Sequence, residues 1–207
     1  MAQVETAAAS PHLALILDID GVHIVPFESR SEGYVRHPRF TLSAYNPAHG
    51  PWLNRIYETS ADIYYISDSK VLSHWAIGQY LGVPEFDWID TDHYASRRAA
   101  TRRSLAITAL FGDRPLVWVD DFIRRPEMAW ARERRDRGIA TLAVGTDQYI
   151  GLQPTHMQHI DRWFDRWEQE RSARGIPALP ARPERDTDLE ARHIERADRW
   201  FAQLTSQ

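Results

Sequence analysis

The stretch Leu13-Ala14-Leu15-Ile16-Leu17-Asp18-Ile19-Asp20-Gly21 decides the fold of this 207-residue chain. Its first five residues are apolar and end at a turn signal, which predicts a strand buried on both faces. Asp18 and Asp20 would then point the same way, because side chains of an extended backbone alternate with a period of two. Two carboxylates that close repel each other unless a cation or a shared proton intervenes. The stretch therefore indicates metal-assisted chemistry; a strand that ends in a simple Asp-Gly turn is the structural alternative.

Alternating apolar runs and helical patterns predict the rest of the fold. Further buried strands are expected at residues 63–66, 86–89, 116–119 and 139–144. Helical patterns are expected at 51–59, 71–81, 97–111, 126–138 and 154–167. Strands that alternate with helices form parallel sheets through βαβ crossovers. We therefore expect an α/β fold, a three-layer Rossmann-like parallel sheet.

The chain divides into one main domain and an extension. The α/β domain is expected over residues 11–170, with the turn-rich segment 22–48 as a small flap, because it is too short for a large cap. Three prolines in the stretch from Gly175 to Asp186 indicate a linker, which we place at 171–187. An amphipathic helix over 188–207 is expected to pack back on the domain; a homodimer contact is its alternative use.

Composition excludes several classes of protein. The chain has no cysteine, which leaves carboxylates and histidines as the strong metal ligands. A net charge of −4 argues against a general nucleic-acid binder. No stretch approaches the roughly 20 apolar residues of a membrane span, and the first ten residues lack a basic leader. We expect a cytoplasmic protein without a membrane partner.

Two more polar clusters follow predicted strands. Ser67 follows the strand at 63–66 just before a helix, where free N–H groups favour a phosphate, although simple N-capping is the alternative. Asp120 and Asp121 follow the strand at 116–119 and offer the oxygen ligands that Mg²⁺ prefers, although a turn is again the alternative. Because the carboxyl ends of parallel strands share one edge, both clusters would meet Asp18 and Asp20 in one crevice.

The order Asp-x-Asp-Gly, then Ser, then Asp-Asp resembles the haloacid dehalogenase-like (HAD) superfamily. More narrowly, the chain looks like the HAD domain of bacterial "Swiss Army Knife" RNA-repair-type proteins. The resemblance covers about residues 13–167 and includes the segments 81–84, 114–121 and 145–156.

The resemblance implies a Mg²⁺-dependent phosphatase that forms an aspartyl-phosphate. Asp18 would be the nucleophile, and Asp20 the general acid and then the base. Mg²⁺ would be held by Asp18, by the backbone carbonyl of Asp20, and by Asp120 or Asp121. Ser67 would bind the phosphoryl oxygens.

One departure from the family pattern concerns the positive charge at the site. Family members usually carry a lysine at the start of the helix before the Asp-Asp strand; here Arg102 and Arg103 are nearest in register. Lys70 is the only lysine of the chain and could reach a phosphoryl group bound at Ser67. The phosphate-binding cation is thus expected to be Lys70, Arg102 or Arg103. His23 stands where an aliphatic residue is usual and is expected to contact the substrate.

An arginine-rich segment bears on the substrate class. Arg97 and Arg98 lie within seven positions of Arg102 and Arg103, and no acidic residue occurs between His93 and Gly112. If this segment borders the crevice, it favours a nucleotide or a nucleic-acid end as substrate; a solvated arginine-rich face is the alternative. Two other functions compete with a phosphatase: a dehalogenase, which needs no metal, and a catalytically silent binding or regulatory module.

Overall fold

Strand β1 (Leu13–Leu17) lies at the centre of the sheet, because all five of its side chains are apolar and fully buried. The structure is a computed structural model that describes residues 13–29, 31–59, 61–67, 72–92, 94 and 99–175. The sheet is parallel and five-stranded, in the order β6-β5-β1-β7-β8. The other strands are β5 (Ala61–Tyr65), β6 (Asp87–Trp88), β7 (Leu116–Asp120) and β8 (Thr141–Gly145).

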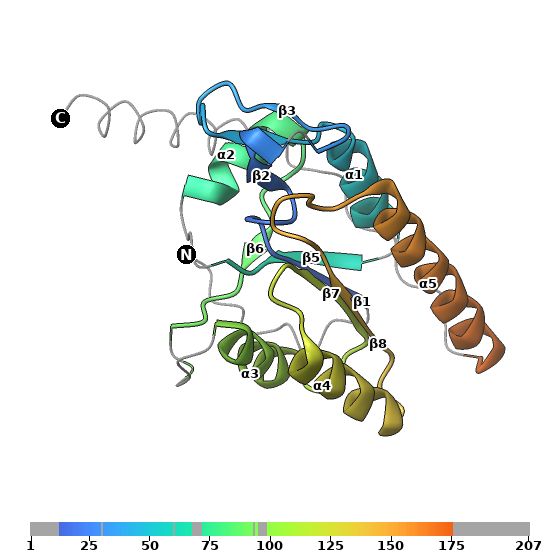
Figure 1. Ribbon diagram of the computed structural model, residues 1–207. Coiled ribbons are helices and arrows are strands. Elements are labelled where there is room, and N and C mark those ends of the chain that lie inside the picture. The colour runs from blue at the N-terminus through green and yellow to red at the C-terminus, as the bar shows by residue number, and fades with distance from the viewer. Residues whose placement is uncertain are drawn as a thin grey trace.

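Helices cover both faces of this sheet (Figure 1). Helices α1 (His49–Thr59), α2 (Leu72–Leu81) and α5 (Pro154–Ala173) share a core cluster with Leu13, Leu15 and Leu17 of β1. Helices α3 (Ala99–Phe111) and α4 (Arg125–Asp136) share the opposite cluster with Ala14 and Ile16. Strand side chains alternate between faces, so β1 anchors both clusters. The predicted three-layer α/β fold is confirmed.

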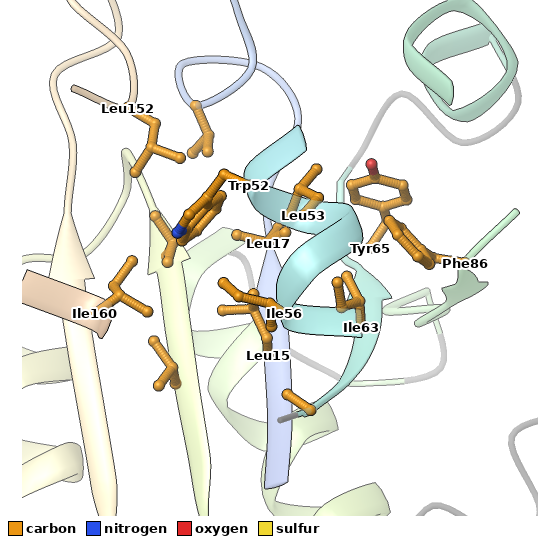
Figure 2. Packing of buried hydrophobic residues seen from close by; sticks show 14 of the residues in the cluster. Leu15, Leu17, Trp52, Leu53, Ile56, Ile63, Tyr65, Phe86, Leu152 and Ile160 are labelled. Carbon is orange, nitrogen blue, oxygen red and sulfur yellow. The ribbon is translucent and has the colours of Figure 1, made fainter. Parts of the chain in front are cut away.

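The packing of α1 on β1 illustrates how the core forms. Figure 2 shows Leu53 and Ile56 of α1 against Leu15 and Leu17. These four side chains are fully buried, and each contributes about 1.5–3 kcal/mol to folding by leaving water. This packing holds the C-terminal end of β1 in place, and Asp18 is the next residue along the chain.

The segment after β1 forms a small flap of its own. Strands β2 (Ile24–Pro26), β4 (Ser43–Tyr45) and β3 (Val35–Arg36) pair antiparallel in that order, and the 3₁₀ helix η2 (Phe27–Ser29) follows β2. Among the described residues, this flap is the insertion next to the end of β1. It is too small to be a large cap domain.

The end of α5 differs from the expected boundary. The linker was expected from residue 171, but α5 continues to Ala173. Arg171 is buried because it stacks over the Trp167 ring at 5.6 Å and pairs with Glu168, which extends the helix. The helix expected at 188–207, with its possible homodimer contact, lies outside the described residues. Within the described part of the chain, no helix combines the length and apolarity needed to cross a membrane.

Candidate active site

The aligned ends of β1, β5 and β7 bring the acidic clusters together. Leu17 pairs with Tyr65 on one side and with Val119 on the other. The next residues along each strand therefore leave the sheet at one edge. Asp18 and Asp120 are buried there, and Ser67 is buried at the end of β5.

Asp18 and Asp20 line the same cleft but differ in exposure. Asp18 is 1 % exposed, and its Oδ1 accepts a 2.7 Å hydrogen bond from the Ile19 N–H. Asp20 is exposed, and the Ser67 hydroxyl donates to its Oδ2 over 3.4 Å. A buried and a solvated carboxylate on one edge suit two different chemical roles.

Arg103 of α3 lies between two of the buried carboxylates. Its Nη1 is 2.6 Å from Asp18 Oδ2 and 2.6 Å from Asp120 Oδ2. The Arg103 side chain is 2 % exposed, so this contact is shielded from water. Such charge-assisted bonds hold both carboxylates in place, and losing the cation would leave two buried negative charges uncompensated.

The adjacent acids Asp120 and Asp121 have different surroundings. Asp120 Oδ1 accepts from the Phe122 N–H at 2.8 Å, and Oδ2 accepts from the Trp118 indole at 3.1 Å as well as from Arg103. Asp121 Oδ1 is buried and has no hydrogen-bond partner among the described residues. Asp120 is therefore occupied in positioning Arg103, whereas Asp121 offers an unused ligand atom.

The pKa values of the three buried acids are all raised, chiefly by burial. Burial and the Asp120 charge raise the pKa of Asp18 well above its ordinary value, while Arg103 opposes the shift. Burial also raises the pKa of Asp120, against Arg103 and the Phe122 N–H. Burial and the Asp120 charge raise the pKa of Asp121 to about 6. Each raised pKa means that additional positive charge near these acids would stabilise their ionised forms.

This arrangement fits a hard divalent cation. Ligand atoms of Asp18, Asp120 and Asp121 lie within 4.8 Å of one another. One Asp121 oxygen has no partner among the described residues, and the pKa values of the three acids are raised. Both observations favour a bound cation. An all-oxygen ligand set of this kind suits Mg²⁺.

A cleft of about 430 Å³ opens over these residues, which is within the range of small-molecule sites. Its floor carries Asp18, Asp20, Ser67, Arg103 and Asp121. Its walls come from the flap, from the turn after β7 and from the loop after β8: Gly21, Ile24, Val25, Pro26, Leu42, Ser43, Phe122, Gln148 and Tyr149.

His23 does not reach this cleft. It was expected to contact the substrate, but its ring is fully buried and its Nδ1 lies 3.0 Å from Nδ1 of His49. The Gly21-Val22 turn directs the His23 side chain toward α1, which explains the difference. His23 therefore packs between the start of the flap and α1, and it does not line the cleft.

The remaining predicted residues fall in several places. Arg102 is half-buried and is not among the residues that line the cleft. Lys70, Arg97 and Arg98 lie outside the described residues. Of Arg102 and Arg103, the two candidates for the phosphate-binding cation that the structure describes, Arg103 is the one that contacts Asp18.

Several residues of the cleft escaped the sequence analysis. Trp118 does not line the cleft, but its buried indole N–H donates to Asp120. Phe122 follows the Asp120-Asp121 pair after β7, and Tyr149 comes two residues after Asp147 in the loop after β8. The signal was therefore an apolar side chain in a polar turn. Leu42 carries no sequence signal, because only the folding of the flap brings it to the cleft.

Comparisons with known proteins do not establish a function for this chain, so the functional proposal rests on the side chains of the site. No family model matches the sequence, and no curated protein matches it. A solved structure from Legionella pneumophila, described as an HAD superfamily (subfamily III A) hydrolase, is similar to this chain at 13% identity. The similarity covers 80% of this chain and 88% of that one, with a TM-score of 0.41.

Proposed function

We propose that this chain is a Mg²⁺-dependent phosphatase of the HAD type that works through an aspartyl-phosphate on Asp18. The observation that carries the proposal is the Arg103 guanidinium between Asp18 and Asp120, beside an Asp121 oxygen with no partner among the described residues. A phosphate ester is an anion, so a carboxylate can attack it only where nearby positive charge offsets the repulsion.

The chemistry takes two steps. In the first, a carboxylate oxygen of Asp18 bonds to phosphorus and the bond to the leaving oxygen breaks, while Asp20 gives that oxygen a proton. In the second, Asp20 takes a proton from water, the water oxygen bonds to phosphorus, and the Asp18 carboxylate is released. The exposure of Asp20 supports this role, because its carboxyl must meet both leaving group and water.

Each surrounding group has a defined task. Arg103 holds the Asp18 carboxylate in position and favours its ionised form. The Ser67 hydroxyl would donate to a phosphoryl oxygen. Mg²⁺ would be held by Asp18, Asp121 and the Asp20 carbonyl, with Asp120 fixing Arg103 beside them. When bound, Mg²⁺ supplies charge that reduces repulsion between nucleophile and phosphate.

Hydrolysis of p-nitrophenyl phosphate tests the proposal. We expect turnover with Mg²⁺ and none after chelation. Asp18→Asn should lower kcat by about 10³-fold or more, because an amide cannot form the acyl phosphate. Acid-quenched wild-type protein should carry one phosphoryl group on the peptide that contains Asp18, detected by mass spectrometry.

Other outcomes would identify the competing functions. Halide release from a 2-haloacid without metal would support the dehalogenase. Mg²⁺ binding without turnover of any ester would support the silent module. Near-native turnover by Asp18→Asn would exclude the aspartyl-phosphate.

Nucleotides and nucleic-acid ends are the proposed substrates. The basis is the arginine-rich segment with Arg97 and Arg98, part of which lies outside the described residues. Affinity for a phosphorylated oligonucleotide should fall steeply with salt, and replacing Arg98 and Arg102 together by alanine should flatten that slope. A slope that the double variant leaves unchanged would remove this basis.

A further inference from the structure

We propose that the outer part of the cleft is a leaving-group subsite for an uncharged planar ring, formed by Leu42, Phe122 and Tyr149. This inference rests on the proposed function, because it names the substrate class of the same site. The ring belongs to the organic part of a phosphate monoester whose phosphoryl group sits at Asp18.

The first observation is where exposed apolar side chains gather. Leu42 is 77% exposed, Tyr149 55% and Phe122 45%, and all three line the cleft above Asp18. They come from three separate segments: the turn before β4, the loop after β8 and the turn after β7. Large apolar side chains that converge around one concave site mark a place where a ligand buries them.

The second observation is that hydrogen bonds hold the backbone segments that carry the two aromatic residues. The Tyr149 N–H donates to Asp147 Oδ1 at 2.8 Å, in a loop whose Thr146 hydroxyl donates to the Gly21 carbonyl at 2.7 Å. The Phe122 N–H donates to Asp120, and the Arg103 guanidinium carbon lies 5.2 Å from the Phe122 ring centroid. The segments that carry both aromatic residues are thus anchored beside the acidic residues, and a preorganised contact costs little entropy on binding.

The third observation is the distribution of charge. Among the described residues that line the cleft, the charged ones are Asp18, Asp20, Arg103 and Asp121, all on the floor. The upper walls are apolar or neutral. These walls favour binding of a neutral ring, which can stack on Tyr149, over binding of a hydroxyl-rich or charged leaving group.

Gln148 indicates which type of ring the subsite binds. This residue lines the same cleft, and a glutamine amide can both donate and accept a hydrogen bond. The edge of a nucleobase presents donors and acceptors, whereas a phenyl ring presents none. We therefore assign the ring to a nucleobase.

The test compares pairs of esters that differ by the ring. Adenosine 5′-monophosphate and ribose 5-phosphate share the sugar phosphate, so the ratio of their kcat/KM values isolates the base. We expect a ratio on the order of tenfold, as one stacking contact provides. Tyr149→Ala should bring the ratio close to one. Ile150→Ala is the matched control, because Ile150 is 50% exposed next to Tyr149 but does not line the cleft.

Further experiments distinguish a nucleobase from a plain aromatic ring. They also distinguish failure of the subsite from failure of the proposed function. Benzyl phosphate against ethyl phosphate gives the same comparison without ring nitrogens, and a larger ratio there would overturn the assignment to a nucleobase. Equal kcat/KM values within both pairs would overturn the subsite itself. If no ester is hydrolysed, the proposed function fails, and calorimetry decides the subsite alone. In that case, equal dissociation constants of Asp18→Asn for adenosine 5′-monophosphate and ribose 5-phosphate would overturn it, and tighter binding of the nucleotide would support it.

Discussion

At the scale of single residues, the electrostatics of the cleft depend on Arg103. One buried guanidinium bonds to Asp18 and to Asp120, and the pKa values of both acids are raised by burial despite it. Removing one member of a buried ionic cluster costs about 3–5 kcal/mol when the remaining charges stay unpaired. The cluster is therefore sensitive to each of its members in a different way.

Replacing Arg103 should impair catalysis more than replacing any other candidate cation. We expect Arg103→Met to lower kcat on the order of 10²-fold, because the nucleophile and phosphate lose a nearby positive charge. Arg103→Lys keeps a cation and should restore part of the rate. Steady-state kinetics, with melting curves to confirm folding, measure the effect. A collapse of kcat in Lys70→Ala with a mild effect of Arg103→Met would give the role to Lys70.

Substitutions at Asp120 and at Asp121 should have different effects on the Mg²⁺ dependence of the activity. Asp121→Asn should raise the Mg²⁺ concentration for half-maximal rate and reduce the rise in Tm that Mg²⁺ produces, since Asp121 contributes the oxygen that has no other partner among the described residues. Asp120→Asn should mainly lower kcat, because it loosens Arg103. Titration with Mg²⁺, followed by rate and by Tm, distinguishes them. Equal Mg²⁺ dependence in both variants would contradict this division.

At the scale of elements, the turn after β1 is fitted to the turn after β7. Gly21 has φ +73°, and a Cβ there would lie 2.6 Å from Asp121 Cγ. The Thr146 hydroxyl binds the Gly21 carbonyl, and the Leu152 N–H binds the Val22 carbonyl at 2.9 Å. Three connecting loops thus lock together around the acids.

A methyl group at Gly21 should therefore displace the Asp121 carboxylate. We expect Gly21→Ala to weaken Mg²⁺ activation about tenfold (an order of magnitude set by about 1.4 kcal/mol of lost coordination) and to cost about 1–2 kcal/mol of stability from the left-handed backbone. Gly138→Ala is the matched control, since Gly138 has φ +83° with nothing within 4 Å of its Cβ position. Both should lose stability by urea unfolding because of the left-handed backbone, and Gly21→Ala should lose more, because the Asp121 side chain must move. Only Gly21→Ala should change Mg²⁺ activation, and an equal change in Gly138→Ala would refute the steric account.

At the scale of the whole molecule, a buried histidine pair joins the flap, α1 and the loop before α5. His49 Nε2 lies 2.9 Å from the Leu152 carbonyl, which can only accept, so this nitrogen carries the proton. His49 Nδ1 then accepts from His23 Nδ1 at 3.0 Å. A proton on His49 Nδ1 would face another N–H. In this arrangement the His49 ring is neutral.

This neutrality predicts acid sensitivity. Burial lowers the pKa of His49 to about 4 from an ordinary 6.5, so the unfolded chain binds the extra proton first. The stability from His49 is complete above pH 6.5 and is lost as the pH falls toward 4. The loss amounts to about 3 kcal/mol. Burial lowers the pKa of His23 in the same direction, whereas the raised pKa values of the buried acids act oppositely.

The comparison with His49→Gln isolates this contribution, because glutamine can keep both hydrogen bonds without titrating. Urea unfolding at several pH values between 4 and 6.5 should show a stability difference between wild type and variant that shrinks with acid by about 3 kcal/mol. Parallel pH profiles would show that His49 does not titrate with unfolding.

The sequence by itself determined the sheet and the residues that leave its edge. Leu13–Leu17 is predicted and observed with the same bounds, because an apolar run closed by Asp-Gly carries its strand signal locally. The parallel order follows from the helices between strands, and it places Asp18, Ser67 and Asp120 at one edge. Those inferences need only neighbouring residues.

Tertiary structure alone decided which side chains meet. Arg103 lies 85 positions from Asp18, and nothing local distinguishes it from Arg102 except which face of α3 is buried. The different surroundings of Asp120 and Asp121, the burial of His23, and the convergence of Leu42 with Tyr149 likewise depend on contacts across the fold. Sequence patterns report the backbone and its burial, whereas hydrogen-bond partners and cleft walls form between segments that only packing brings together.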